Sequence, residues 1–251
     1  MTLPSNSSLV VISSKYRLDK KNQSTSNFEI NLNQPLWCFG YSIKNISIPN
    51  TQYNINLKNN DFQIETGGVI FSYTVPVGQY TTTELITVLE QEFPTLTITQ
   101  DPLTKKITID TGASSLVVPE TEIISGFGIL GYTYYQVLSG VITADHLVKL
   151  NGVYNAYIIS SDLTQNNANQ GLMRDGARVD LVSEVSITSP FGVYTNISET
   201  SYGLNTTLFD KGSNIQKIGI KVVDLDQNVL NLQGLDVEIV LKVYQERNDD
   251  K

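Results

Sequence analysis

The chain is poor in the residues from which disulfides, metal sites and redox centres are built. Its 251 residues include one cysteine, Cys38, and one histidine, His146. A single cysteine cannot form a disulfide within the chain, and a zinc site of the Cys/His type needs several such ligands. We therefore expect no metal ion and no other cofactor.

Charged residues are also scarce, at 17% of the chain, and they give a formal net charge of −8. Nucleic acids and anionic membrane surfaces attract proteins of the opposite sign. We therefore expect no specific nucleic-acid binding. One small basic cluster runs against this balance: Lys15, Arg17, Lys20 and Lys21. It is typical of a solvated strand end, although contact with a nucleic acid or an acidic neighbour stays open.

Long apolar runs are absent as well. A membrane-spanning helix needs about 20 consecutive, mostly apolar residues, and no run in this sequence approaches that length. Near the N-terminus, the run Leu9-Val10-Val11-Ile12 follows no basic segment and is too short for the core of a secretion signal. We expect a protein that is made inside the cell and is neither secreted nor inserted into a membrane.

What the chain does contain is a repeated pattern of strands. Hydrophobic residues make up 40% of the chain, which is enough for a core. Phe28, Ile30 and Leu32 alternate with polar residues, which predicts a strand with one buried face. Pro35 has no N–H to donate, so this strand is expected to stop there or to lie at an edge.

A second strand is predicted over residues 41–48. The spacing between Ile43 and Ile46 breaks strict alternation, which indicates a β-bulge. Pro49-Asn50 is expected to end the strand, because proline lacks a donor and asparagine tolerates turn geometry. Alternation resumes over residues 53–57, where a further short strand is predicted.

Residues 61–112 have the pattern of a compact β-β-α-β-β unit. Two hairpins, over 62–75 and 96–111, flank the one clear helix. The helix is expected to begin after Thr81, which can cap it while Glu84 completes a capping box. Its apolar face and its end are defined by Leu85, Ile86, Val88, Leu89, Phe93 and Pro94. We expect an insertion, because strand patterns resume after it without a linker-like tract.

Strands are predicted again in the C-terminal half, and the last has the clearest pattern. Its alternate residues share one face: Val237, Ile239, Leu241 and Val243. Val240 and Tyr244 fall on the other face, and partial burial on both sides is typical of a strand in the middle of a sheet. The other strands predicted here are residues 156–160, 179–187 and 215–224, with polar loops at 161–178 and 188–214.

One motif suggests the chemistry of an aspartic protease. Asp110-Thr111-Gly112 follows an apolar strand, as in that class of enzyme, where two carboxylates share a proton. The second motif would be Asp210-Lys211-Gly212, in which lysine replaces the small hydroxyl residue. Because Asp and Gly commonly end strands, we prefer the structural interpretation and predict no catalytic residue.

Three other features resemble parts of functional sites. Gly126-Phe127-Gly128-Ile129-Leu130-Gly131 has the spacing of a phosphate loop, but an aromatic β-like run follows it where a helix is required. Asp224-Leu225-Asp226-Gln227-Asn228 opens like a calcium loop, but Val229 stands where glycine is required. His146 has no nucleophile or metal ligand near it in the sequence. We interpret all three as structural.

The 13 tyrosines leave a binding function open. Tyrosine is frequent at interfaces, and it suits sugar stacking because its ring is apolar and its hydroxyl is polar. Tyr132, Tyr134 and Tyr135 are the candidates if the chain is a glycan- or receptor-binding β-sandwich. In a strand-rich chain many tyrosines also form cross-strand pairs.

A last pattern consists of several stretches taken in order. They are Phe28–Leu32, Ile48–Asn50, Tyr53–Ile55, Asn59-Asn60, Gly78–Thr81, Leu130–Tyr132, Ile218–Asp224 and Leu235–Leu241. Together they resemble the penton, or minor capsid, proteins of virophages and Polinton-like viruses, over most of residues 9–246.

The resemblance implies a mainly β fold: an antiparallel β-sandwich, specifically a single jelly roll of two four-stranded sheets, in residues 1–60 and 136–251. Residues 61–135 would form the inserted α+β subdomain. The resemblance also implies a structural capsid protein without catalysis, which forms homopentameric penton capsomers at the five-fold vertices of an icosahedral virion beside a double-jelly-roll major capsid protein. The alternatives are a glycan- or receptor-binding β-sandwich and, with less support, an aspartic protease acting through Asp110.

Overall fold

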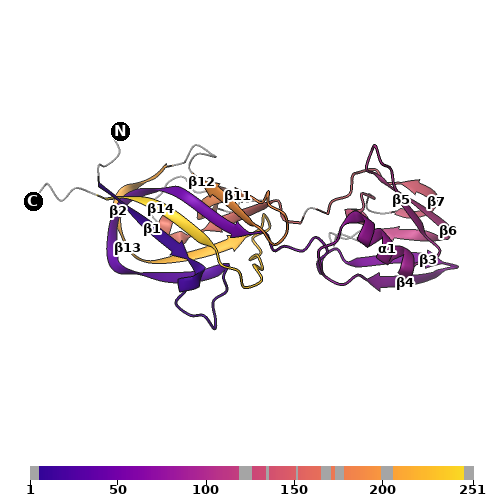
Figure 1. Cartoon of the computed structure of the whole chain (residues 1–251), viewed down its shortest axis with the longest axis horizontal. Helices are drawn as coiled ribbons and strands as arrows, with labels where there is room; N and C mark the ends of the chain where they lie inside the picture. Colours follow the sequence, from indigo (N-terminus) through magenta and orange to yellow (C-terminus); the bar gives the residue numbers. More distant parts are fainter. Residues whose placement is uncertain are drawn as a thin grey trace, which may run out of the picture. The chain divides into compact units, whose positions relative to one another are not determined.

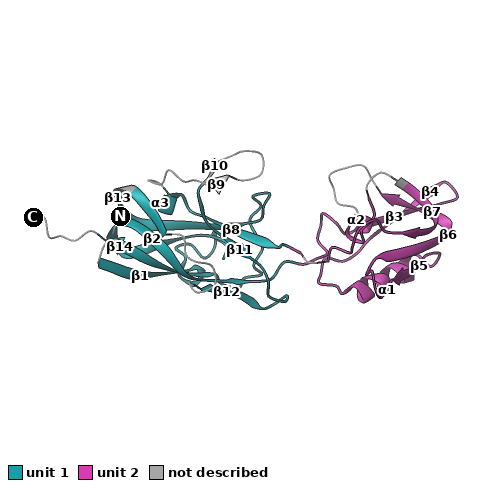
Figure 2. Cartoon of the chain, turned by 90° about the horizontal axis from the view of Figure 1, so that it is seen from above, with its two compact units in different colours: residues 1–52, 153–251 teal, residues 53–152 magenta. Residues whose placement is uncertain are grey.

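A computed structural model of the chain describes residues 6–118, 126–133, 136–150, 152–164, 171–172, 178–198 and 206–245. These residues are mainly β-strand and belong to two compact units (Figure 2). Unit 1 comprises residues 1–52 and 153–251, and unit 2 comprises residues 53–152. Within the described ranges, no helix is long and apolar enough to cross a membrane.

Unit 1 contains the first and last strands of the chain (Figure 1). In chain order its strands are β1 (Asn6–Ser13), β2 (Asn27–Pro49), β8 (Asn155–Ile159), β9 (Gly171–Leu172), β10 (Arg178–Val179), β11 (Leu181–Ser186), β12 (Tyr194–Ser198), β13 (Thr206–Val223) and β14 (Glu238–Gln245). A 3₁₀ turn, Ser14–Tyr16, follows β1, and the short helix α3, Ser161–Thr164, follows β8.

The strand pairings of unit 1 form two layers. In the first layer β1 pairs with β14, β14 pairs with the second half of β2, and the end of β2 pairs with β12. In the second layer the start of β2 pairs with the end of β13, β13 pairs with β8, and β8 pairs with β11. Each layer thus has four antiparallel segments, and the long strands β2 and β13 run between the layers. This is the strand order of a jelly roll.

Both layers of unit 1 pack on one hydrophobic core. Its members in the first layer include Ile12, Ile46, Ile48, Ile239, Leu241 and Val243, and those in the second include Phe28, Ile158, Val185, Ile218 and Ile220. Full burial of one such side chain contributes roughly 1.5–3 kcal/mol. A core shared by two antiparallel layers confirms the predicted β-sandwich.

The bulge predicted in the second half of β2 is confirmed. Ile43 lies opposite Leu241 of β14, whereas Asn45 lies opposite Val240. Lys44 is therefore the extra residue in β2. Its insertion lets Ile43 and Ile46 both reach the core although they are three positions apart.

Of the two outcomes predicted for Pro35, the strand does not end there but it does lie at an edge, because residues 27–38 of β2 pair only with β13 among the described strands. β2 continues through Pro35, and the register shifts between the pairs Asn31–Lys217 and Leu36–Ile215. Residues 32–35 of β2 thus face the single residue Gln216 of β13. This bulge keeps Pro35 out of the ladder, so its missing N–H removes no ladder hydrogen bond.

β14 lies between β1 and β2, in the middle of its layer, as its sequence predicts. Ile239, Leu241 and Val243 are buried on the core face. On the opposite face Tyr244 is also buried, and its hydroxyl lies 3.1 Å from Ser42 Oγ, within hydrogen-bond distance. β14 is therefore buried in part on both sides, which explains its apolar character.

Unit 2 is built around one antiparallel sheet. Its elements are β3 (Asp61–Thr66), β4 (Val69–Thr74), α1 (Thr82–Glu92), β5 (Thr97–Gln100), β6 (Ile107–Val118), α2 (Gly126–Ile129) and β7 (Gln136–Thr143). β7 pairs along one side of β6, while β5 and β3 pair with successive parts of its other side, and β4 lies outside β3. The order β-β-α-β-β predicted for residues 61–112 is confirmed.

The helix α1 begins as the sequence predicts. The Glu84 N–H donates to Thr81 Oγ1 at 3.2 Å, and the Thr81 N–H donates to the Glu84 carboxylate at 2.8 Å, so the capping box is confirmed. Leu85 and Leu89 are buried in a second hydrophobic core that α1 shares with the sheet. This core has no residue in common with the core of unit 1.

The boundaries of the two units differ from the predicted ones. The chain divides at 52/53 and 152/153 rather than at 60/61 and 135/136. The main reason is β7, which was expected in the sandwich but pairs with β6 through contacts such as Leu138–Leu116. Pairing between segments far apart in the chain cannot be read from local alternation.

The short strand predicted over residues 53–57 does not form. Its only pairing in the described chain is an isolated bridge between Ile55 and Gly78. The side chain of Asn59 instead accepts the N–H of Asn56 at 2.7 Å. Such bonds from asparagine side chains compete with sheet pairing, which explains the turn found here.

The polar loop predicted over 188–214 contains two strand segments, β12 and the first part of β13. Among the described strands β12 pairs only with the end of β2, which places it at the edge of its layer. An edge strand needs little apolar surface, so the polar sequence of β12 concealed it. The loop predicted over 161–178 lies partly outside the described residues.

Candidate interaction surface

The structure does not support a protease site at Asp110. Asp110 is exposed on β6, and one of its carboxylate oxygens accepts the N–H of Gly112 at 3.0 Å. Thr111 is buried and accepts the N–H of Gly140 at 2.8 Å, which ties β6 to β7. Asp210, the second aspartate considered, belongs to β13 in unit 1. The Asp110 motif therefore acts as part of a strand bulge.

The glycine-rich segment Gly126–Gly131 is a packing element. α2 has four residues and is largely buried, and a Cβ on Gly126 would overlap the Phe62 ring. Gly131 has φ +98° and lies against the carbonyl of His146. His146 has an exposed side chain, and its backbone N–H donates to the Gly131 carbonyl at 3.0 Å. These glycines permit close backbone approach and leave no space for a phosphate.

The calcium-like segment is a turn. Asp224 accepts the N–H of Asn228 at 2.8 Å, and Val223 forms a bridge with Val229. In the described parts of the chain, no group of three His, Cys, Asp or Glu residues is placed to hold a metal ion. Burial raises the pKa of the Cys38 thiol to about 11, so the thiol stays protonated at neutral pH.

Tyr132 is not available to stack on a sugar. It is 3% exposed, and its hydroxyl lies within hydrogen-bond distance of the carbonyls of Ile107 and Ile142, at 3.3 and 3.1 Å. Burial raises the pKa of this phenol. The other two tyrosines of the predicted group, Tyr134 and Tyr135, lie outside the described residues.

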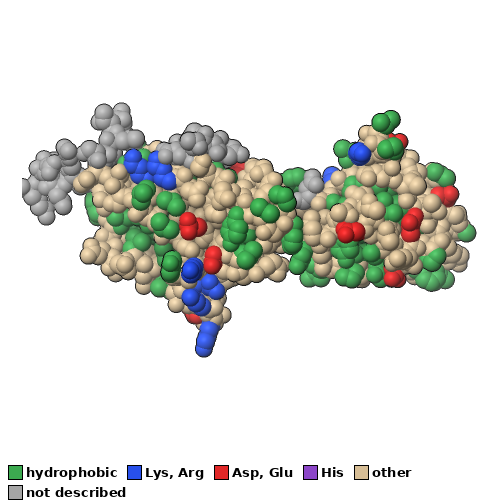
Figure 3. Space-filling model, in the orientation of Figure 1, with side chains coloured by type: hydrophobic (Ala, Val, Ile, Leu, Met, Phe, Trp, Pro, Cys, Tyr) green, Lys and Arg blue, Asp and Glu red, His purple; other side chains and the backbone are tan. Residues whose placement is uncertain are grey.

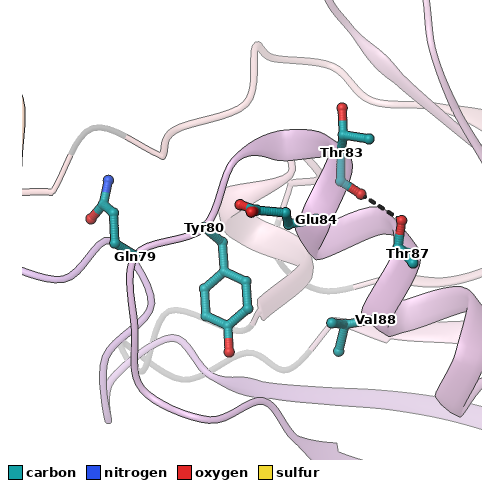
Figure 4. A pocket seen from close by; sticks show the side chains of 6 residues that line it. All are labelled: Gln79, Tyr80, Thr83, Glu84, Thr87 and Val88. Atoms are coloured by element: carbon teal, nitrogen blue, oxygen red, sulfur yellow. Dashed lines mark hydrogen bonds between the residues drawn. The ribbon is translucent and has the colours of Figure 1, made fainter.

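A shallow hollow of about 410 Å³ lies beside the first turns of α1 (Figure 4). It is lined by Gln79, Tyr80, Thr83, Glu84, Thr87 and Val88. Hydrogen bonds from Thr81 hold the Glu84 carboxylate and lower its pKa. The Tyr80 hydroxyl donates to the carbonyl of Pro76 at 2.9 Å. Local hydrogen bonds thus hold both the Glu84 carboxylate and the Tyr80 hydroxyl at the side of this hollow.

Exposed apolar side chains lie on both edge strands of the first layer of unit 1. On β1, Leu9 is 68% exposed and Val11 is 54% exposed. At the opposite edge, Val193 is 50% exposed and Tyr194, the first residue of β12, is 38% exposed. We call these the β1 flank (Leu9, Val11) and the β12 flank (Val193, Tyr194). Exposed apolar groups on opposite edges are suited to contacts between protein molecules.

The sequence alone did not identify these flanks as functional. The run Leu9–Ile12 is apolar at every position, so a strand formed by it necessarily exposes part of its apolar surface. This lack of alternation was the available signal on β1. The β12 flank was hidden inside the segment predicted as a polar loop.

The basic cluster found in the sequence forms the loop between β1 and β2. Figure 3 shows Lys and Arg side chains gathered on this projecting loop. Arg17 stabilises the loop itself, since its guanidinium donates to the carbonyls of Ser14 and Gln23 at 2.9 and 3.1 Å. Lys15, Lys20 and Lys21 are exposed, which agrees with a solvated strand end.

Comparison with solved structures found similar chains, and two of them match this chain over nearly its whole length. The mavirus penton protein has a TM-score of 0.52 and 8% identity over 96% of this chain and 100% of its own. A chain in the cryo-EM structure of the Sputnik virophage has a TM-score of 0.50 and 13% identity over 96% of this chain and 98% of its own. No protein-family model and no curated protein sequence matches the chain.

The match to the mavirus penton protein includes nearly every residue of both chains, so it covers the sandwich and the inserted unit together. At 8% identity it establishes the fold rather than the role. The chain has the fold of a virophage penton protein, a jelly roll with an α+β unit inserted between two of its strands.

Proposed function

We propose that this chain is a structural capsid protein whose copies form closed five-membered rings at the vertices of an icosahedral virion. The observation that carries the proposal is the end-to-end likeness to the mavirus penton protein, which includes the insertion. On this proposal the chain is made inside the host cell and performs no catalysis, and its function is to fit beside copies of itself.

The two flanks of unit 1 support a ring. A closed ring of identical subunits needs two different patches, because each subunit contacts its neighbour on either side through a different surface. The β1 flank and the β12 flank lie at opposite edges of one layer. In the proposed ring, Leu9 and Val11 of one subunit pack against Val193 and Tyr194 of the next.

The ends of the sandwich suggest how a ring is oriented. Asn6 lies opposite Gln245, so the described chain ends are together at one end of unit 1. Ser13 and Ser47 both lie opposite Glu238 at the other end, near Pro49, beyond which the chain continues into unit 2. We propose that the end with the chain termini contacts a double-jelly-roll major capsid protein.

Native mass spectrometry of the purified chain tests the ring. The expected species has five times the chain mass of 27.8 kDa, about 139 kDa. Its population should rise with protein concentration, because assembly is a mass-action equilibrium. A chain that stays monomeric at the highest soluble concentration would overturn the proposal.

A flank variant tests the contact itself. Leu9→Asp with Val11→Asp places two charges in the proposed interface without touching the core, and should abolish the ring. The matched control is Leu103→Asp, at a residue that is 90% exposed on the turn between β5 and β6. A ring that withstands the double change as well as the control would exclude the β1 flank.

A further inference from the structure

Three strands of the unit 2 sheet have only one partner among the described residues: the four-residue β5 and the two longer strands β4 and β7. β4 pairs only with β3, without a break in register over six residues, and β7 pairs only with β6. Each therefore presents one row of backbone N–H and C=O groups that no described strand takes up. Such edges are templates for pairing with another chain.

Neither edge carries charge or proline, and the pairing of β7 with β6 is interrupted only at Gly140, where φ is +86° and the register shifts. Soluble proteins protect edge strands with charged residues or proline. β4 reads VIFSYT and β7 reads QVLSGVIT, with no charged residue and no proline in either. The inner neighbour of β4 is β3, and this strand has two acidic residues, Asp61 and Glu65. Charge is thus absent from the strands where it would block association.

The two edges also match in side chains. On the face covered by α1, β4 carries Phe71, which is 50% exposed, and β7 carries the partly buried Leu138. On the open face, β4 carries Ile70, which is 59% exposed, and β7 carries Val141, which is 73% exposed. If the edges were joined with the faces aligned, apolar groups would meet apolar groups on both sides of the sheet.

Strand direction favours a head-to-tail arrangement. Along the path β4–β3–β6–β7 every pair is antiparallel, so β4 and β7 run in opposite directions. When copies are related by rotation about an axis roughly parallel to the strands, β4 of one copy meets β7 of the next in antiparallel orientation. The ladder then continues with the same alternation that it has within each sheet.

We propose that β4 of one copy pairs with β7 of the neighbouring copy, so that the sheets of unit 2 join around the ring. The inference rests on the proposed ring, in which each unit 2 has one neighbour on either side. A six-residue pairing is small for a stable interface, and it therefore acts together with the contacts of unit 1. The occupant of each edge is a second copy of this chain.

Site-specific cross-linking of the full chain tests the pairing. Ser72→Cys on β4 and Ser139→Cys on β7 place thiols on the open face of each edge, and the native Cys38 is buried. Within one copy these positions are three strand spacings apart, roughly 14 Å, which a short bis-maleimide cannot span. The doubly substituted chain should give a covalent ladder that ends at five copies.

The single variants separate the alternatives. Neither Ser72→Cys nor Ser139→Cys alone should give cross-links, because head-to-tail pairing brings different strands together. Covalent dimers from Ser72→Cys alone would indicate a symmetric β4–β4 contact and would overturn the proposal. Intact rings that give no ladder from the double variant would overturn it as well, while leaving the proposed function in place. A chain that forms no ring would contradict the proposed function instead.

A charge on the edge provides an independent test. Phe71→Lys in the doubly substituted chain should cause loss of the ladder while the ring itself remains in native mass spectrometry. The matched control is Leu103→Lys in the same background, a charge at an exposed residue away from both edges, which should leave the ladder unchanged. A full ladder with Phe71→Lys would contradict pairing through β4.

Discussion

Truncation of one side chain should distinguish the two cores of this chain. Leu89, on α1, is fully buried in the core of unit 2 and makes no part of the core of unit 1. Leu89→Ala removes buried apolar surface and leaves a cavity, while alanine keeps the helix intact. Such changes destabilise a core by about 2–5 kcal/mol.

The size of unit 2 converts this loss into a temperature shift. For a domain of up to about 100 residues, each kcal/mol lowers Tm by roughly 4–8 °C. A loss of about 3 kcal/mol therefore lowers the transition of unit 2 by roughly 12–24 °C. The transition of unit 1 should not move, because its core residues are untouched.

Differential scanning calorimetry at one fixed protein concentration provides the measurement, since assembly also shifts Tm. The matched variant is Leu241→Ala, a fully buried leucine on β14, which should lower the other transition instead. Leu103→Ala, on an exposed turn, should move neither. A single transition in the unaltered chain, or an equal fall of both transitions with Leu89→Ala, would refute the independence of the two cores.

Three further predictions concern single residues. Thr81→Ala should destabilise unit 2 by about 1 kcal/mol in urea unfolding, because a helix cap is lost. The same change should raise the pKa of Glu84, which NMR titration can follow. In the native chain the hydrogen bonds to Thr81 lower this pKa from its ordinary value of 4.5. Their contribution to the stability of unit 2 is therefore complete above pH 4.5 and is lost as the pH falls through the lowered pKa. Cys38, with its pKa of about 11 and its buried side chain, should react with a thiol reagent at pH 8 only after unfolding; rapid reaction of the native chain would contradict its burial. Gly131→Ala should destabilise unit 2 strongly, because a side chain at φ +98° is strained and its Cβ would overlap the His146 carbonyl. Gly67→Ala has φ +61° and open space around the Cβ, so it should cost only the backbone strain. Equal urea midpoints for the two variants would contradict this.

The proposals depend on one another, so the experiments that test them have a natural order. Native mass spectrometry comes first, because a ring is the common premise of the flank contacts and of the pairing between β4 and β7. Cross-linking then asks whether unit 2 takes part in the ring. The absence of a ring would contradict the proposed function, whereas a ring without cross-links would contradict only the pairing of β4 with β7.

Local chemistry is what the sequence by itself determined. The capping box of Thr81 and Glu84 is made by neighbouring residues and was predicted correctly. The bulge at Lys44 follows from the spacing of two isoleucines, and the central place of β14 follows from apolar residues on both of its faces. In each case the signal and the structure that it produces lie within a few residues of one another.

Only the tertiary structure decided which distant segments pair. It placed β7 in unit 2, drew β12 out of a segment predicted as a loop, and let β2 pass Pro35 through a bulge opposite Gln216. The exposed flanks and the unpaired edges became visible in the same way. Whether a strand ends at an edge depends on every other strand in its sheet, and that information is spread over the whole chain.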